Sequence, residues 1–528
     1  MRFLTTLAAL LLAAGPGLAQ APANVGQSPA PRIFRLATST DAATLDPHAT
    51  NALFTFLVVS QVYESLILRG DDLKLRPGLA TRWEQVEPTR WRFHLRPNVR
   101  FAGGEAFDAE DVVFSITRAL APTSNYGIFV DTVERAEAVD ALTVDIVTRA
   151  PDAVIPDKMT RILVMDRGWS EANRGAVPQN FAAREELPVV RTANGTGPFM
   201  IRSREADQRT VMVRNPNWWG EAGPVTEYHH IVLGSDATRV AALLSGEVDF
   251  VHVVPVQDVA RIRANSRLRV LEGQENRTVW LGFRQDLEEL PGSDVRGRNP
   301  FRDLRVRQAV AHAIDVEGLR RTTLRGQAVP TGSMWTQFVN GYDEATNTRL
   351  PLDRDRARRL LAEAGYPQGF AVPLDCPVGT YDEACQAVVA MLNQVGIRAS
   401  LNLLPNAIFS QRLRRQETGF FALSWGVPTF DATYTMRAIM ASRSIGGGAS
   451  WNAGGWSDPA FDALLARVDS ERDPATRRTL MAEAQRLHNA QVGHLPLYHM
   501  MIPWAHRQGV TLAHRADNQL QVNDVRFD

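Results

Sequence analysis

Residues 91–115 read WRFHLRPNVRFAGGEAFDAEDVVFS and place a strand before a helix. Every second residue from 91 to 95 is apolar, which is typical of a half-buried β-strand. A second alternating run follows at 142–146. Between them, Asp108 can cap a helix whose apolar residues recur at three-to-four spacing. These helix residues are Val112, Val113, Ile116 and Leu120. The stretch therefore predicts a helix between antiparallel strands.

The second half of the chain alternates helices with short strands. Asp353 can cap one helix, and Asp458-Pro459 and Asp473-Pro474 each place a capping acid before a proline at the first helical position. Apolar runs such as 420–425 predict strands. Helix and strand together predict an α/β protein with a mixed sheet flanked by helices.

The N-terminus has the pattern of a secretory signal peptide. Arg2 precedes an apolar run at 7–14, then come the helix breakers GPG at 15–17 and an A-x-A cleavage pattern at 19–21. We therefore expect a signal peptide over 1–21 and a disordered, proline-rich leader over 22–31. No cysteine follows the apolar run to accept a lipid, so the expected product is a periplasmic protein without a lipid anchor.

Composition excludes several classes of function. The formal net charge is zero, which removes the long-range attraction to phosphate on which nucleic-acid binding depends. The only lysines, Lys74 and Lys158, do not follow a glycine, so the chain lacks the P-loop of an ATPase. No G-x-S-x-G, H-E-x-x-H or G-x-G-x-x-G motif is present. We expect no catalytic residues, and an exported hydrolase is the rival class.

Cysteines and histidines are the candidate metal ligands. Cys376 and Cys385 can form a disulfide in an oxidising compartment, and two buried free thiols are the alternative. Two cysteines without close histidines offer too few metal ligands. The C-terminal histidines lie at spacings of six, five and seven, which do not share one helical face. They are His488, His494, His499 and His506. We therefore expect no metal and no cofactor.

An ordered set of short motifs covers nearly the whole mature chain. They are TLDPH (44–48), VYESL (62–66), LRPGLATRWE (75–84), WRFHLR (91–96), VRF (99–101), DAEDVVFS (108–115), GTGPF (195–199), RNP (214–216), AALLSGEVD (241–249), RQAVAHAID (307–315) and LLAEAGY (360–366). This set resembles the extracellular solute-binding proteins of family 5, which serve dipeptide, oligopeptide and nickel ABC transporters.

The resemblance implies a periplasmic-binding-protein type II fold, with two lobes around a hinged cleft and an additional domain. Domain I would be discontinuous and combine residues 32–55, 192–285 and 505–528. Domain II, the additional domain, would cover 56–191. Domain III, the second lobe, would cover 286–504.

The resemblance also implies where a solute is bound. The expected contacts are Asn51, Ala52, Leu53, Trp280, Ser424, Trp425 and Asp431. Trp280 and Trp425 could equally belong to the core.

One departure from the family affects the expected solute. Peptide-binding members often carry an aspartate three residues after the tryptophan at 425, and it pairs with the ligand's amino terminus. Pro428 stands there and offers no charge. Asp431 could substitute for that aspartate or could cap a helix over 433–440.

The implied function is that of a monomeric receptor that closes on a peptide-like solute and delivers it to an ABC permease with separate ATPase subunits. Closure would be a population shift, because the solute contacts both lobes only in the closed form. A metal or haem carrier of the same fold is the alternative. Nucleic acid is not an expected partner.

Overall fold

The computed structural model describes residues 32–379, 381–443 and 451–528. The expected signal peptide and leader lie outside these ranges. None of the described helices has the length and apolar character needed to cross a membrane.

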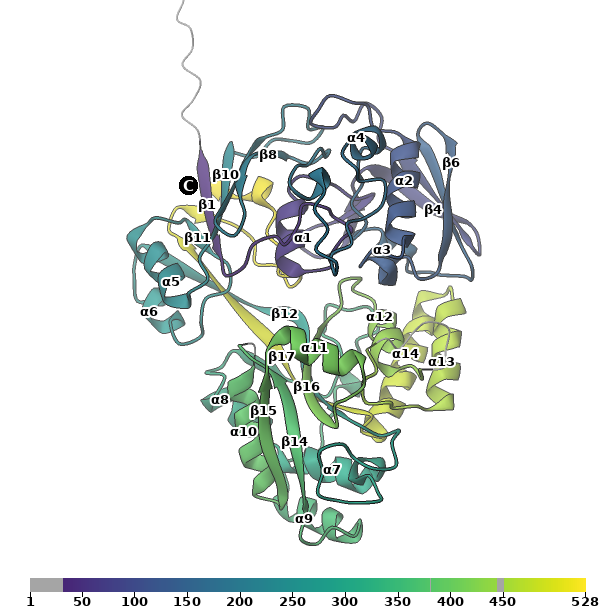
Figure 1. Cartoon of the computed structure of the whole chain (residues 1–528), viewed down its shortest axis with the longest axis vertical. Helices are drawn as coiled ribbons and strands as arrows, with labels where there is room; N and C mark the ends of the chain where they lie inside the picture. Colours follow the sequence, from purple (N-terminus) through teal and green to yellow (C-terminus); the bar gives the residue numbers. More distant parts are fainter. Residues whose placement is uncertain (1–31, 380, 444–450) are drawn as a thin grey trace, which may run out of the picture.

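One large mixed sheet extends through the molecule (Figure 1). Ten of its strands lie in the order β15 (Ile397–Leu404), β14 (Phe370–Pro377), β16 (Phe420–Gly426), β12 (Leu268–Phe283), β17 (His494–Arg507), β11 (Phe250–Val251), β1 (Ile33–Thr38), β10 (Glu227–Val232), β9 (Arg209–Arg214) and β8 (Phe199–Glu205). β13 (Ala328–Pro330) pairs with β17.

Two long antiparallel strands, β12 and β17, cross from one half of the molecule to the other (Figure 1). We call residues before β12 and after β17 the upper half, and residues between these strands the lower half. The register between the two strands shifts from Gln274 to Thr278, so the ladder is interrupted midway along β12. The halves are thus joined by two strands that carry an irregularity between them.

A separate four-stranded sheet lies in the upper half, in the order β4 (Ala80–Glu87), β5 (Arg90–Leu95), β7 (Thr143–Thr148) and β6 (Val133–Asp140). Helix α2 (Ala109–Leu120) packs against it. The Asp108 carboxylate accepts a hydrogen bond from the backbone N–H of Glu110 and closes a capping box with Asp111. The predicted helix between antiparallel strands is confirmed. Two smaller pairs join β2 (Ile67–Arg69) to β3 (Leu75–Pro77) and β18 (Val510–Thr511) to β19 (Arg526–Phe527).

The other described helices are distributed over the two halves. In the upper half they are α1 (Leu53–Val59), α3 (Ile155–Lys158), α4 (Arg167–Ala172), α5 (Asp236–Ser245) and α6 (Val259–Arg263). In the lower half they are α7 (Leu304–Ala313), α8 (Val316–Thr322), α9 (Arg354–Glu363), α10 (Asp382–Asn393), α11 (Asn406–Arg414), α12 (Thr433–Thr435), α13 (Pro459–Ser470) and α14 (Pro474–Ala490). Asp353, Asp458 and Asp473 cap α9, α13 and α14, as predicted.

Buried apolar residues gather in separate cores. The buried residues of one core lie within residues 66–164, and the partly buried Trp219 and Tyr434 pack against them. A second joins the start of the chain to its end, from Phe34 to Val525. Two more lie within residues 279–498, in the lower half and in β12 and β17. The three-domain division stays a proposal. The core within residues 66–164 lies inside the expected domain II, but the second core also contains buried residues from 56–63 and 163–190, so it crosses the boundaries expected at 55/56 and 191/192.

Candidate functional site

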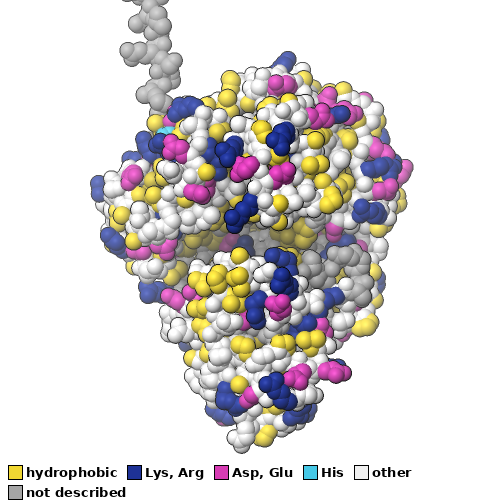
Figure 2. Space-filling model, in the orientation of Figure 1, with side chains coloured by type: hydrophobic (Ala, Val, Ile, Leu, Met, Phe, Trp, Pro, Cys, Tyr) yellow, Lys and Arg dark blue, Asp and Glu magenta, His cyan; other side chains and the backbone are white. Residues whose placement is uncertain are grey.

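The candidate site is a cavity of about 860 Å³ lined by residues of both halves. The space-filling view shows the recess between them (Figure 2). The upper half contributes residues around the start of α1, and the lower half contributes the end of β16 and α12. Residues 275–277 of β12 lie between these two walls, at the interruption of the ladder. A bound molecule would therefore contact both halves and the crossing strand.

Four of the seven predicted contacts line this cavity. They are Asn51, Leu53, Ser424 and Trp425. Ala52 is the N-cap residue of α1 and lies between two of them in sequence. The Trp425 ring packs on Tyr434 and Trp451, with centroids 5.5 and 5.7 Å apart. The two segments that the family motifs indicated thus face each other across the cavity.

Trp280 does not line the cavity, contrary to expectation. Its side chain has no exposed surface and packs edge-on against Phe421 and His494, at 5.7 and 4.7 Å between centroids. β12 is buried on both faces at this point, because Val279 and Leu281 on its other face join a different core. Trp280 is therefore a residue of the hydrophobic core, which was the alternative to a ligand contact.

Asp431 also lies outside the cavity lining. Its carboxylate accepts hydrogen bonds from Arg477 at 2.6 and 2.9 Å and from the Asn340 amide at 2.8 Å. It also accepts from the backbone N–H of Thr433 at 3.1 Å, but the N-cap residue of α12 is Ala432, so the predicted cap by Asp431 is not formed. Burial opposes ionisation, but Arg477 holds the pKa of Asp431 below its usual range. Pro428 does line the cavity. Neither position presents a free carboxylate to a ligand.

Charged side chains that sequence reasoning missed are prominent in the cavity wall. Its five arginines are Arg69, Arg76, Arg161, Arg277 and Arg515, and its four acids are Glu64, Glu275, Asp517 and Asp524. Nothing in the sequence distinguished these residues, because arginine occurs throughout the chain. The folded structure brings these arginines and acids together, and no local motif marks them.

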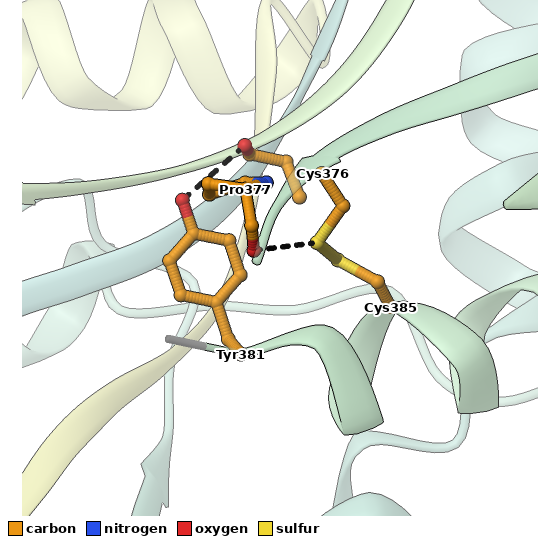
Figure 3. Close-up of a disulfide and its surroundings, with 5 residues drawn as sticks. Cys376, Pro377, Tyr381 and Cys385 are labelled. Atoms are coloured by element: carbon orange, nitrogen blue, oxygen red, sulfur yellow. Dashed lines mark hydrogen bonds between the residues drawn. A yellow bond between two sulfur atoms is a disulfide. The ribbon is translucent and has the colours of Figure 1, made fainter. Parts of the chain in front are cut away.

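A disulfide holds the loop that forms part of the lower wall. Cys376 at the end of β14 is bonded to Cys385 in α10, which settles the sequence alternative in favour of the bridge (Figure 3). Pro377 and Tyr381, within the bridged segment, line the cavity. The Tyr381 hydroxyl donates to the Ala422 carbonyl at 3.4 Å. The bridge therefore connects two secondary-structure elements beside the cavity.

The C-terminal histidines take part in local contacts within the protein. The ring nitrogens of His488 and His494 lie 3.0 Å apart, and His499 Nδ1 lies 2.9 Å from the Thr278 hydroxyl. Burial lowers the pKa values of His488 and His499 to about 3, so both rings are neutral. His506 bonds the Arg507 carbonyl. Across the described residues, no three His, Cys, Asp or Glu side chains are grouped as metal ligands.

A ligand-sized cavity between two halves that are joined by crossing strands defines a two-lobed solute-binding protein. Residues 74–447 match the profile of the bacterial extracellular solute-binding proteins, family 5 middle region, and the chain belongs to this family. This confirms the predicted periplasmic-binding-protein fold of the α/β class. Proteins of this family are periplasmic transport binders rather than enzymes.

The relatives carry different solutes. The chain is 26% identical to di/tripeptide-binding protein 2 of Pseudomonas aeruginosa over 506 residues, which cover 90% of this chain and 91% of that protein. It is 25% identical to the nickel-binding periplasmic protein of Escherichia coli, with 89% of each chain covered. Its fold is similar to that of the periplasmic binding protein DppA of Helicobacter pylori in complex with the peptide STSA. The TM-score is 0.79 at 19% identity, with 94% of this chain and 98% of that chain covered.

Proposed function

We propose that this protein is the periplasmic receptor of an ABC importer, that it binds a peptide-like solute between its two halves, and that it catalyses no reaction. The observation that carries the proposal is the cavity of about 860 Å³ with walls from both halves. Pockets of roughly 300–1,000 Å³ accommodate small organic ligands, so a short peptide or a compound of similar size fits. The di/tripeptide-binding and STSA-bound relatives support a peptide-like solute.

The site residues that we assign to the solute are those of the cavity wall. Asn51 and Leu53 come from the upper half, and Ser424 and Trp425 come from the lower half. A solute that touches both walls stabilises the form in which they are close, because the open form offers only one wall at a time. Shifting such an equilibrium from about 1:99 to 99:1 requires about 5.5 kcal/mol of differential affinity. The closed form would then be recognised by the membrane permease.

The proposed location of the protein is the periplasm. The pattern at residues 1–21 supports secretion through a signal peptide, and the Cys376–Cys385 disulfide suits the oxidising periplasm. The zero formal net charge supports a solute, rather than a nucleic acid, as the partner.

A thermal-shift screen of the purified mature protein tests the proposal. The probes are tripeptide mixtures, glutathione, opines, sugars, nickel and haem. A solute at 100 times its Kd adds about 2.7 kcal/mol of stability to the folded state, which is a measurable rise in Tm. A shift with nickel or haem alone would favour the carrier alternative. If no probe raises the Tm and a model peptide or ester is hydrolysed, the receptor proposal fails.

A further inference from the structure

The chain enters the cavity wall through a buried segment that is neither helix nor strand. This segment, residues 39–52, connects β1 to α1. Residues 44–49 are all buried, whereas Thr50 and Asn51 line the cavity. Buried backbone groups outside helices and strands need other hydrogen-bond partners. Side chains from elsewhere in the fold must therefore hold the segment in place.

Arg118 of α2 holds the segment through Asp46. Neither side chain has exposed surface, and Arg118 donates from Nη1 to Asp46 Oδ1 at 3.1 Å and from Nη2 to Asp46 Oδ2 at 2.8 Å. Nε donates to the Gly175 carbonyl at 2.7 Å, and Nη2 to the Val177 carbonyl at 3.2 Å. Burial opposes the ionisation of Asp46, but the charge of Arg118 holds its pKa below the usual range. The buried ion pair thus attaches the segment to α2.

The His48 ring lies between this ion pair and a second segment of the chain. Its Nδ1 is 3.0 Å from Arg118 Nη1, and its Nε2 is 2.9 Å from the Leu163 carbonyl oxygen. Burial and the charge of Arg118 lower the pKa of His48 to about 3, so the ring is neutral and carries one proton. A guanidinium only donates and a carbonyl only accepts, so Nδ1 accepts from Arg118 and Nε2–H donates to Leu163. Both ring nitrogens are therefore committed.

The two segments that His48 joins form part of the upper cavity wall. Leu163 and Arg161 line the cavity, as does Asn51, three residues after His48. Arg161 Nη2 donates to the Asn51 side-chain oxygen at 3.3 Å. The backbone N–H of Asn125, a further wall residue, donates to the His48 carbonyl at 3.1 Å. The bonds His48–Leu163 and Arg161–Asn51 thus link the two wall segments at both ends.

We infer that His48 is a positioning residue of the solute site, which holds the upper wall in its binding geometry without contacting the solute. This inference rests on the proposed receptor function and deepens it. Asp46, His48 and Arg118 do not line the cavity, so their effect on a solute is indirect. A wall that is ordered before binding raises the affinity, because the solute does not have to order its side chains. Asp46 and Arg118 keep the His48 ring in the required orientation.

Two amide substitutions separate the two hydrogen bonds of His48. In His48→Asn, the amide oxygen stands near the position of Nδ1 and can accept from Arg118, but the side chain is too short to reach Leu163. In His48→Gln, the amide NH2 stands near the position of Nε2 and can donate to the Leu163 carbonyl. Both variants lose the edge-on contact of the ring with Tyr126, at 5.7 Å between centroids. A difference between them therefore does not come from that packing.

Calorimetric titration with the strongest tripeptide mixture of the screen measures the effect. His48→Asn should weaken binding at least about 10-fold, because the solute must then order Asn51 and Arg161. His48→Gln should bind within about threefold of the wild type. His230→Asn is the matched control, because His230 is also fully buried in the upper half but bonds the Thr38 hydroxyl, at 2.8 Å. It should lower the Tm and leave the affinity unchanged.

A double-mutant cycle tests whether His48 acts through Asn51. Asn51→Ala removes the acceptor of the Arg161 hydrogen bond, so one of the two links between the wall segments is already lost. Adding His48→Asn to this variant should then weaken binding by less than about threefold. If the two losses multiply as independent effects, the positioning role is wrong.

The outcomes separate this inference from the proposed function. If His48→Asn binds with wild-type affinity, or if His48→Gln loses at least 10-fold (about 1.4 kcal/mol), the positioning role is wrong while the receptor proposal stands. The result for His48→Gln decides this even if His48→Asn does not fold. If no probe of the screen binds the wild-type protein, the receptor proposal itself fails, and the positioning role fails with it.

Discussion

Two tryptophans on neighbouring strands have opposite environments. Trp425 on β16 pairs with Thr278 of β12, and its half-buried ring lines the cavity. Trp280 on β12 pairs with Leu423, and its ring is fully buried. The same residue type therefore serves the proposed site in one case and the core in the other.

Trp425→Ala should reduce solute affinity without unfolding the protein. The variant removes an aromatic surface that packs on Tyr434 and faces the cavity. We expect a loss of about 10- to 100-fold, or about 1.4–2.8 kcal/mol, since burying an aromatic side chain on binding is worth this order. Calorimetric titration with the strongest peptide mixture of the screen measures it. Unchanged affinity would remove Trp425 from the site.

Trp280→Ala is the matched core substitution. It removes a fully buried ring and should lower the free energy of unfolding by about 3–5 kcal/mol. Urea denaturation measures the change. The folded fraction should keep an affinity close to that of the wild type, and an affinity loss as large as that of Trp425→Ala would show that Trp280 shapes the cavity after all.

The raised pKa of the Glu64 carboxyl group should make the stability of the protein depend on pH. Burial raises the pKa of Glu64 from 4.5 to about 7, although the Trp218 and Trp219 indoles and the charge of Arg96 partly oppose this. Because the folded state holds the proton more tightly, stability falls as the pH rises from about 4.5 to about 7 and then levels off. The linkage amounts to about 3 kcal/mol. Burial also raises the pKa values of Asp111 and Asp157 to about 6, and these groups titrate in both proteins. Urea unfolding at pH 4.5 and pH 8 should therefore show a loss about 3 kcal/mol larger in the wild type than in Glu64→Gln.

Exposed Glu483 gives the control for that experiment. Glu483→Gln on α14 should leave the pH dependence as it is in the wild type. If Glu64→Gln also retains the full pH slope, the titrating group is not Glu64.

Sequence could predict site residues that lie beside short motifs, but not residues whose role depends on contacts with distant parts of the chain. Asn51, Leu53 and Trp425 lie beside short local motifs, so a family pattern located them. Arg161 bonds Asn51 and packs on the Phe56 ring, contacts that join positions about 110 residues apart and that no local motif marks. Asp431 was ambiguous because Arg477, 46 positions away, decides its role.

At the scale of secondary-structure elements, the disulfide between β14 and α10 could not be predicted from sequence, whereas several helices could. Sequence could identify the two cysteines but not their pairing, because only the packing of α10 against β14 brings the sulfurs together. Helices with local caps, such as α2, α9 and α14, were predictable because capping acids and apolar spacing are encoded within a few residues.

Replacing both cysteines by serine should destabilise the protein by about 3 kcal/mol, the chain-entropy value for a loop of about ten residues. The same variant should weaken solute binding less than Trp425→Ala does, because Tyr381 keeps its hydrogen bond to the Ala422 carbonyl. Urea denaturation with and without dithiothreitol measures the first effect. The reductant should destabilise the wild type but not the double serine variant. Equal sensitivity of both proteins to the reductant would contradict the structural role of the bridge.

For the whole molecule, the ordered motifs predicted two lobes but not how they are connected. β12 and β17 are separated by more than 200 residues, and their pairing continues one sheet from the upper into the lower half. Single-sequence patterns do not encode such long-range register. The interruption from Gln274 to Thr278 lies beside the cavity, so the irregular part of the connection between the halves adjoins the proposed binding site.

Arg69 makes direct contacts between the two halves. It belongs to β2 of the upper half, donates to the Thr429 carbonyl of the lower half at 2.6 Å, and lies 4.6 Å from the centre of the Phe430 ring. A hydrogen bond from a charged donor contributes about 1.5–3 kcal/mol. Arg69→Gln should therefore shift the equilibrium toward the open form by about 10- to 100-fold and weaken solute binding accordingly, because the solute must then also restore closure.

Arg76→Gln controls for the loss of positive charge from the cavity. Arg76 also lines the cavity and lies in the upper half, but its ion pair is with Asp72 of the same half. Small-angle X-ray scattering without solute should show a larger radius of gyration for Arg69→Gln than for Arg76→Gln or the wild type. Saturating solute should restore the compact value in all three proteins, because binding energy compensates for the lost contact. If Arg69→Gln weakens binding but leaves the radius of gyration unchanged, Arg69 contacts the solute directly and does not control closure.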